Sequence, residues 1–243
     1  TAMNHKEYKQ IVPGAEHAIL FIHGILGTPD HFDDLISLVP DDISIHNLLL
    51  DGHGKTASDF SQTSMHQWEI QVEQAVADLL KTHARVSIVA HSMGTLFAIQ
   101  QAICTGEISG LFLLAVPIVV SPKLRMFSNA FKVYWGRNDR FGAAAKAACS
   151  ISPSRNPFHY LGWIPRYLEL FQKIHKTRTL LQDLHTPTIA IQSRLDEMVS
   201  KNADRYLRKH TSMDVYTLEK SYHYLYDSQE LIKLKELFQG FLP

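Results

Sequence analysis

One stretch of the chain decides its fold: Val86-Ser87-Ile88-Val89-Ala90-His91-Ser92-Met93-Gly94. The apolar residues before Ser92 predict a buried strand, and residues 95–103 predict a helix. A serine at the sharp turn between such a strand and helix is typical of a nucleophile elbow, which strains the backbone and exposes the hydroxyl. Ala90 and Gly94 leave room for the strand and helix to pass close together, although Ala90 replaces the usual glycine. The alternative is an ordinary turn in which Ser92 only caps the helix.

Length and composition restrict the class of protein. The chain has 243 residues, enough for one large α/β domain, and its 45% hydrophobic and 20% charged residues are typical of a soluble globular protein. The formal net charge of zero argues against a nucleic-acid partner. The polar first residues predict no signal peptide, and the longest apolar run, residues 111–120, is too short to span a membrane. Two cysteines, Cys104 and Cys149, indicate a reducing, cytoplasmic setting without disulfides.

Apolar runs of strand length recur along the chain. Besides the run that ends at the elbow, they occupy residues 17–22, 43–50, 110–116, 188–192 and 213–218. Amphipathic helical patterns lie between most of them. This alternation predicts a mostly parallel sheet covered by helices on both faces, whose ligands bind at the carboxyl ends of the strands.

Single residues predict where three of the helices begin or end. Thr28 is a candidate N-cap for a helix whose inner face carries Phe32, Leu35, Ile36 and Val39. Ser64 and Gln67 have the spacing of a capping box. Gly106 is expected to end the helix that follows the elbow.

The segment 118–183 breaks the alternation, because it contains no convincing buried strand. We expect it to form a cap over a core made of residues 1–117 and 184–243. The segment carries 11 Lys and Arg against 3 Asp and Glu, and it holds 10 of the 24 aromatic residues. We favour a basic lid that docks on an acidic body. The alternative is weak contact of the basic cap with anionic lipid or with a carboxylate-bearing ligand.

The positions of the histidines along the chain limit which of them can act as the base for Ser92. A serine hydroxyl needs a base in contact with it, and in sheets of this kind the chain order is serine, acid, histidine. Only His210 and His223 follow a plausible late acid. His210 precedes the last strand and so lies at the edge of the sheet opposite to Ser92, whereas His223 follows that strand. We therefore expect His223 to be the base.

The acid should follow the preceding strand, residues 188–192. Asp196 has this position, and a carboxylate there would fix the tautomer of the imidazole and stabilise the imidazolium. Glu197 is one step further along and is expected to point elsewhere. Asp183 and Asp214 lie at the wrong ends of their strands.

Attack on a carbonyl builds a negatively charged oxygen, which needs backbone donors. One expected donor is the N–H of Met93, the residue after the serine. The other is the N–H of Ile25 in the loop His23-Gly24-Ile25-Leu26-Gly27, whose glycines let it close on a substrate. We expect His23 to anchor this loop by hydrogen bonds. His91 is expected to pack against the site or to support it, with direct substrate contact left open.

Together these motifs resemble the α/β-hydrolase family. They are the loop 23–27, the turn Asp51-Gly52-His53-Gly54, the elbow 90–94, Asp196 with the residues after it, and His223. Over nearly its whole length the chain is similar to small bacterial carboxylesterases and monoacylglycerol lipases. The resemblance implies an α/β-hydrolase fold, a mostly parallel sheet flanked by helices, with a small helical cap inserted after the sixth strand of the fold.

The resemblance also implies hydrolysis of carboxylic esters through an acyl-enzyme, with Ser92 as nucleophile, His223 as base and Asp196 as orienting acid. It implies no metal and no organic cofactor, and a serine at position 92 disfavours dehalogenases and epoxide hydrolases. The aromatic cap suggests a neutral, lipid-like ester with an apolar acyl chain as substrate. A thioesterase, amidase or C–C-bond hydrolase with the same three residues is the nearest alternative. A catalytically silent binding protein is a more distant one.

Overall fold

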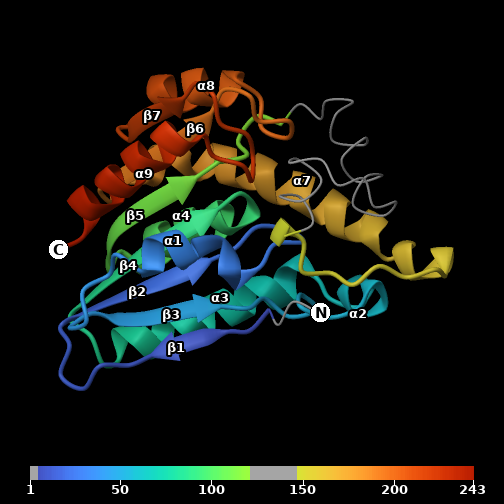
Figure 1. The fold of residues 1–243 in the computed structure, drawn as a ribbon, viewed down its shortest axis with the longest axis horizontal. Coiled ribbons are helices and arrows are strands. Elements are labelled where there is room, and N and C mark those ends of the chain that lie inside the picture. The colour runs from blue at the N-terminus through green and yellow to red at the C-terminus, as the bar shows by residue number, and fades with distance from the viewer. Residues whose placement is uncertain (1–4, 121–146) are drawn as a thin grey trace.

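The computed structural model describes residues 5–120 and 147–243, which build a seven-stranded sheet (Figure 1). The strands lie in the order β1-β3-β2-β4-β5-β6-β7. Their bounds are β1 Tyr8–Gln10, β2 His17–Ile22, β3 Ser44–Leu48, β4 Arg85–His91, β5 Ile108–Leu114, β6 Thr188–Ser193 and β7 Asp214–Leu218. β1 runs antiparallel to β3, and every other neighbouring pair is parallel. The predicted mostly parallel sheet is therefore confirmed.

The side chains of β2 explain why the sheet needs a layer on each face. Ala18, Leu20 and Ile22 belong to one buried cluster, whereas Ile19 and Phe21 belong to another. Successive side chains of a strand point to opposite faces, so both faces of β2 are buried. A continuous apolar run, rather than an alternating one, is the pattern that such a strand requires.

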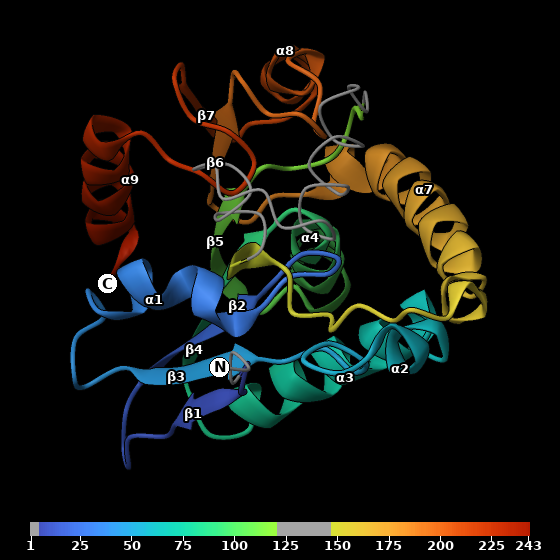
Figure 2. The ribbon, with the colours of Figure 1, turned by 45° about the vertical axis from the view of Figure 1, so that its right-hand side comes forward.

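Helices cover both faces of the sheet (Figure 2). The short α1 (Asp33–Ile36) and α9 (Ser228–Phe241) cover the face with the second cluster, and α3 (Met65–Leu80) and α4 (Met93–Thr105) cover the face with the first. The other bounds are η1 Pro29–Phe32, α2 Ala57–Ser61, η2 Pro157–Tyr160, α7 Trp163–Leu180, η3 Leu181–Asp183 and α8 Asn202–His210. None of the helices in the described ranges is both long and apolar enough to cross a membrane.

Two of the three predicted helix boundaries are confirmed. α4 ends at Thr105, and Gly106 follows it in the left-handed conformation with a φ of 67°. Thr28 caps as expected, but the structure after it is the 3-10 turn η1 and the four-residue α1 rather than one longer helix. Pro40 disfavours helical backbone at Val39, which limits how far α1 can extend.

The capping box expected at Ser64 and Gln67 forms only in part. The Ser64 side chain accepts the N–H of Gln67, but the Gln67 amide donates to Asp51, 2.6 Å away, instead of turning back to the start of the helix. A complete box occurs one helix earlier, where Thr56 and Asp59 bond reciprocally at the start of α2. The carboxylate of a neighbouring loop is the stronger acceptor for Gln67, and the local pattern does not reveal it.

The segment expected as a cap begins after β5 in the strand numbering of this chain. Its residues 121–146 lie outside the described residues, so the boundaries 118 and 183 stay a prediction. In the described part, α7 lies against α3 and α4 (Figure 2). The expected absence of a long strand holds for residues 147–183, which contribute only one isolated bridge, between Ser152 and Thr56.

Cations on α7 attach it to the rest of the molecule. Lys173 is buried and contacts Glu69 of α3 and Gln100 of α4. Arg166 donates to main-chain carbonyls near the start of α3, and Arg178 donates to one after β5. These contacts agree with the interpretation of a basic segment that docks on the body of the protein.

Candidate active site

The backbone at Ser92 is strained, as an elbow requires. Its φ is 51° and its ψ is −122°, outside the regions that residues with a Cβ ordinarily adopt. The Ser92 side chain makes no capping hydrogen bond to α4, which argues against the alternative of a simple helix cap. Gly94 permits the close approach of strand and helix, because a Cβ there would lie 2.2 Å from the main-chain oxygen of Ile22.

Ser92, His223 and Asp196 form one chain of hydrogen bonds. Ser92 Oγ lies 3.1 Å from His223 Nε2, and His223 Nδ1 lies 2.6 Å from Asp196 Oδ2. The three residues follow β4, β7 and β6, which run parallel to one another, so their carboxyl ends lie at the same edge of the sheet. An ionised carboxylate can only accept hydrogen bonds, so Nδ1 carries the proton and Nε2 is left to accept from the hydroxyl. The structure thus brings together the three side chains that the sequence singled out.

This chain of groups is shielded from solvent. Ser92 is 4% exposed, and Asp196 and His223 are each 1% exposed. Burial by itself lowers the pKa of His223, but the carboxylates of Asp196 and Glu197 outweigh burial and raise that pKa above its ordinary value. The second oxygen of Asp196 accepts two main-chain N–H groups, each at 2.7 Å, which fixes the carboxylate in place.

The expectation for Glu197 is wrong. Its side chain points toward the site rather than elsewhere, and its Oε2 lies 3.4 Å from the main-chain nitrogen of His223. The reason is the path of the loop after β6, which folds against the loop after β7 through the bonds Arg194 N–H to Leu218 and Leu195 N–H to Ser221. Two consecutive carboxylates therefore face the histidine loop.

The expected oxyanion loop lies directly against Ser92. A Cβ on Gly24 would lie 2.9 Å from the Cβ of Ser92, so only glycine fits there. Ile25, Ser92 and Met93 line one cavity. The N–H of Met93 belongs to the first residue of α4, where helical N–H groups have no partner within the helix. Within the described ranges the N–H of Ile25 also donates no hydrogen bond.

The cavity beside Ser92 is apolar and has a volume of about 70 Å³. The loops after β2, β4, β5 and β6 contribute to its wall, and α7 contributes Tyr167, Leu170, Phe171 and Ile174. The segment between β5 and β6 thus provides part of the surface that a group bound at Ser92 would touch.

Three histidines support this region from inside. His23 anchors the loop as predicted, because its Nε2 accepts the N–H of Leu50 and its Nδ1 faces the carbonyl of Gly24. His91 Nε2 lies 3.1 Å from the carbonyl oxygen of His223, so it donates to the histidine loop. Sequence reasoning missed His31, whose ring lies 4.2 Å from that of His91. Burial lowers the pKa of His31 to about 3 and that of His23 to about 4.

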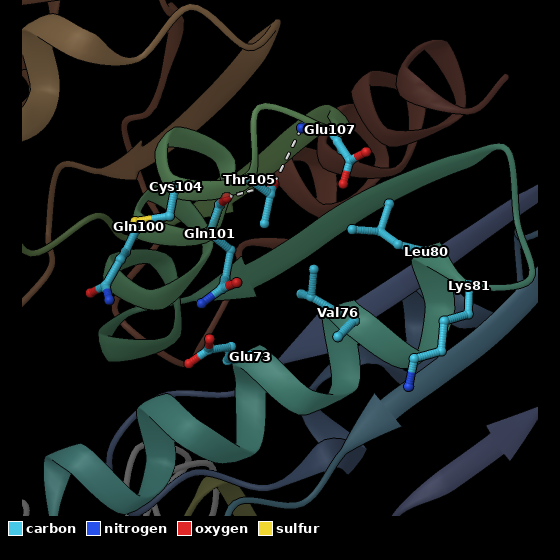
Figure 3. A pocket seen from close by; sticks show the side chains of 10 residues that line it. Glu73, Val76, Leu80, Lys81, Gln100, Gln101, Cys104, Thr105 and Glu107 are labelled. Atoms are coloured by element: carbon cyan, nitrogen blue, oxygen red, sulfur yellow. Dashed lines mark hydrogen bonds between the residues drawn. The ribbon is translucent and has the colours of Figure 1, made fainter.

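A larger hollow of about 520 Å³ lies elsewhere, between α3 and α4 (Figure 3). Glu73, Lys81 and Gln100 stand around an apolar base formed in part by Val76 and Leu80. None of its lining residues belongs to the hydrogen-bonded chain at Ser92. Within the described ranges, no group of three or more His, Cys, Asp or Glu side chains is placed to hold a metal ion.

A strained serine is hydrogen-bonded to a histidine, and the histidine to an acid, on a mostly parallel sheet. This combination is typical of one class of protein. A sequence profile described as the alpha/beta hydrolase family matches residues 19–232. The chain belongs to this family. The comparison with curated proteins finds no match.

Solved structures share the fold at low sequence identity. The chain is similar to a structure described with the metagenome-derived lipolytic enzymes LipS and LipT, with a TM-score of 0.74 and 19% identity over 98% of each chain. A monoacylglycerol lipase of Paleococcus ferrophilus has a TM-score of 0.69 and 16% identity, covering 97% of this chain and 98% of that one. Est1E of Butyrivibrio proteoclasticus, bound to ferulic acid, has a TM-score of 0.66 and 14% identity, covering 97% and 93%. These similarities establish the fold, and membership of the family supports hydrolase activity.

Proposed function

We propose that the protein is a serine hydrolase that cleaves carboxylic esters with apolar acyl chains. Ser92 is the nucleophile, His223 the general base and Asp196 the acid that orients and stabilises the imidazole. The observation that carries the proposal is the buried chain of hydrogen bonds from Ser92 through His223 to Asp196, at 3.1 and 2.6 Å. The pairing of nucleophile, base and orienting group is the arrangement that activates a serine hydroxyl.

The proposed reaction uses an acyl-enzyme. His223 Nε2 removes the hydroxyl proton as Ser92 Oγ attacks the ester carbonyl, and the N–H groups of Ile25 and Met93 stabilise the oxygen that becomes negative. The imidazolium then donates its proton to the departing alcohol, which leaves the acyl group on Ser92. A water molecule, deprotonated by His223, releases the acid by the reverse sequence.

Replacement of the nucleophile tests this mechanism. Ser92→Ala should fold normally and lose at least about a thousandfold in kcat, since binding and the oxyanion donors alone leave only residual catalysis. The measurement is hydrolysis of a chromogenic ester, together with mass spectrometry of the wild-type protein after reaction with a phosphonate ester. An adduct on the Ser92 peptide is expected. Near-normal activity of the variant, or an adduct on another residue, would overturn the assignment.

The apolar cavity supports the choice of acyl chain. Its walls beside Ser92 come from residues such as Leu170, Phe171 and Ile174 of α7. Neighbouring structures described as lipolytic enzymes and as a monoacylglycerol lipase point to the same substrate class. A series of chromogenic esters of increasing acyl length, with monoacylglycerol alongside, should show kcat/KM rising from acetate to longer chains. The highest value for acetate would contradict an apolar acyl site.

An exposed apolar stripe supports contact with lipid. Five large apolar side chains on η2 and α7 and between them are 46–73% exposed: Phe158, Leu161, Ile164, Leu168 and Phe171. Three of these recur on α7 at helical spacing, and Phe171 also lines the cavity beside Ser92. Among the Asp, Glu, Lys and Arg residues of the 151–180 range, the exposed ones are Arg155 and Lys176, and both are cations. An apolar surface with basic flanks suits an anionic lipid surface.

Vesicle sedimentation tests the lipid contact. The wild-type protein should sediment with phosphatidylcholine vesicles that contain phosphatidylglycerol, and the double variant Leu161→Gln/Leu168→Gln should lose most of this binding. Ile232→Gln on α9 is the matched control, because Ile232 is similarly exposed but lies away from the stripe. Equal binding of the double variant and the control would contradict the proposal.

Cleavage of an amide is the second candidate, favoured by one neighbour. A deformylase of Pseudomonas putida S16 shares the fold with a TM-score of 0.61 and 14% identity. Relative kcat/KM values for matched esters, thioesters and amides separate these activities from one another. A protein that forms no phosphonate adduct at all would instead be a silent binding protein.

We place the protein in a reducing, cytoplasmic setting, supported by the free thiols of Cys104 and Cys149.

A further inference from the structure

His53 is a buried histidine that the mechanism above does not use. It follows β3, is 1% exposed, and its ring lies edge-on to that of His23 with centroids 4.7 Å apart. His53 Nε2 accepts the N–H of Leu26 at 3.1 Å, and its Nδ1 faces the carbonyl oxygen of Leu50 at 3.2 Å. An imidazole that accepts at one nitrogen and donates at the other is neutral and in a single tautomer.

The partner of His53 is a strained residue in the oxyanion loop. Residues 24–27 form a β-turn closed by the N–H of Gly27 and the carbonyl of Gly24 at 2.9 Å. Leu26 is the third residue of this turn and has a φ of 58°. Positive φ at that position ordinarily calls for glycine or asparagine, and another residue costs about 1–2 kcal/mol. Such strain persists only where the surroundings hold it.

Two distant segments bind both main-chain polar groups of Leu26. Its N–H is held by His53, and its carbonyl accepts the N–H of Ser150 at 2.9 Å and the Ser150 hydroxyl at 3.4 Å. The preceding residue, Ile25, faces the cavity beside Ser92 and has no hydrogen-bond acceptor for its N–H in the described part of the chain. The conformation of the turn alone therefore sets the direction of the Ile25 N–H.

We propose that His53 is a positioning residue for the hydrolysis: by holding Leu26 in its left-handed conformation, it aims the Ile25 N–H at the oxyanion that forms beside Ser92. The inference rests on the proposed function, since it concerns the oxyanion donor of that reaction. Burial lowers the pKa of His53 well below its ordinary value, so the imidazole stays neutral and keeps its acceptor at neutral pH. The motif Asp51-Gly52-His53-Gly54 thereby gains a physical role.

Two variants of His53 separate its hydrogen bond from its bulk. His53→Phe keeps a ring in the aromatic contacts with Phe60 and Trp68 but has no acceptor, whereas His53→Gln keeps an acceptor. His83→Phe is the matched control, because His83 is also buried and bonded through both nitrogens but lies at the opposite edge of the sheet. Thermal unfolding of all three variants establishes that each is folded at the assay temperature.

The expected results concern the transition state rather than the substrate complex. His53→Phe should lower kcat at least tenfold and leave KM within about twofold, because a misaimed donor affects only the oxyanion. The inhibition constant of a trifluoromethyl ketone, whose adduct with a serine carries an oxyanion, should rise by a similar factor. His53→Gln should stay within about threefold of wild type, as should His83→Phe. Equal losses in the Phe and Gln variants, or in the control, would show that His53 only fills space.

The strain at Leu26 allows a second, independent check. Leu26→Asn places a residue that tolerates positive φ in the turn, so the turn depends less on His53. In the His53→Phe background this change should restore kcat by about threefold or more, whereas in the wild-type background it should not raise kcat. An equal effect in both backgrounds would overturn the coupling between the two positions.

Failure of this inference differs from failure of the proposed function. If the wild-type protein hydrolyses esters and His53→Phe does so equally well, only the role of His53 is wrong. If the wild-type protein neither hydrolyses an ester nor forms a phosphonate adduct at Ser92, the proposed function is wrong and the role of His53 is rejected with it.

Discussion

At the scale of single residues, the candidate site contains strained backbone conformations, which cost free energy and are uncommon in proteins. Three described residues other than glycine have positive φ; one of them, Ser92, lines the cavity, and another, Leu26, directly follows Ile25, which also lines it. Backbone strain of this kind costs about 1–3 kcal/mol for each residue and persists where surrounding bonds maintain it. The proposed nucleophile and the turn that carries a proposed oxyanion donor are both held in this way.

The position of the Glu197 carboxylate near His223 leads to a testable prediction. Because its carboxylate helps to raise the pKa of His223, the rate should fall on acidification through a value above the ordinary one of about 6.5. Glu197→Gln removes that charge and should move the acid limb of the kcat/KM profile to lower pH. The profile is measured between pH 5 and 8.

The control for this prediction is Glu219→Gln. Glu219 is an exposed carboxylate paired with Arg194, and its removal should leave the acid limb in place. A shift of equal size in both variants would mean that the net charge, rather than the position of Glu197, sets the profile.

At the scale of elements, the close approach of α4 to β2 makes the elbow possible. Gly94 on α4 lies against the end of β2, so the backbone of a strand and that of a helix meet without a side chain between them. A flexible side chain could yield to a new methyl group, but the main-chain carbonyl at the end of an interior strand cannot do so cheaply. The geometry at Ser92 therefore depends on a residue two positions away.

Gly94→Ala should demonstrate this dependence. Its Cβ would lie 2.2 Å from the main-chain oxygen of Ile22, so the helix must shift and the free energy of unfolding should fall by at least about 2 kcal/mol. Urea unfolding measures this change, and esterase activity should fall with it. Gly240→Ala on α9 is the matched control, because nothing lies within 4 Å of its Cβ and alanine favours helix by up to about 1 kcal/mol. Equal stability of the two variants would contradict the argument.

α7 connects the described part of the 118–183 segment to the site. Its inner face carries Leu170 and Ile174, which line the cavity beside Ser92, and Lys173, which contacts α3 and α4. The same helix therefore contributes to the wall of the cavity beside Ser92 and to the contacts that attach it to the core. Its outer face carries part of the exposed apolar stripe, so the two faces of α7 suit two different roles.

At the scale of the whole molecule, buried neutral histidines make stability depend on pH. Six described histidines have a pKa below the ordinary value: His17, His23, His31, His46, His53 and His91. Each is protonated more readily in the unfolded chain, so its contribution is complete above a pH of about 6.5 and is lost as the pH falls toward its folded value. That value is about 4 for His23 and about 3 for His31. His223 acts in the opposite sense, since its pKa is raised.

The free energy of unfolding should therefore fall by at least about 2 kcal/mol between pH 7.5 and pH 5, because each strongly shifted histidine contributes about 1.4 kcal/mol for every pH unit below its unfolded pKa. Urea titrations followed by circular dichroism measure this change. A free energy that stays constant or rises over this interval would mean that the buried histidines do not set the pH dependence.

Sequence alone determined the fold and the three residues of the hydrogen-bonded chain. Their order along the chain, and the rule that carboxyl ends of parallel strands share one edge, left few alternatives to Ser92, Asp196 and His223. Helix ends marked by a single residue, such as Gly106, were also predictable, because the signal lies in the local sequence. These features follow from periodicity and local chemistry, which a sequence displays directly.

Only the tertiary structure decided which other side chains meet around this chain. Glu197 turns toward His223, the ring of His31 packs at a tilt against that of His91, and His53 reaches Leu26, because loops from separate strands fold against one another. The side chain of Gln67 likewise donates to Asp51 in a neighbouring loop, which leaves the predicted capping box incomplete. A contact between residues far apart in sequence depends on the path of each loop, and that path is set by packing and hydrogen bonds that no local pattern records.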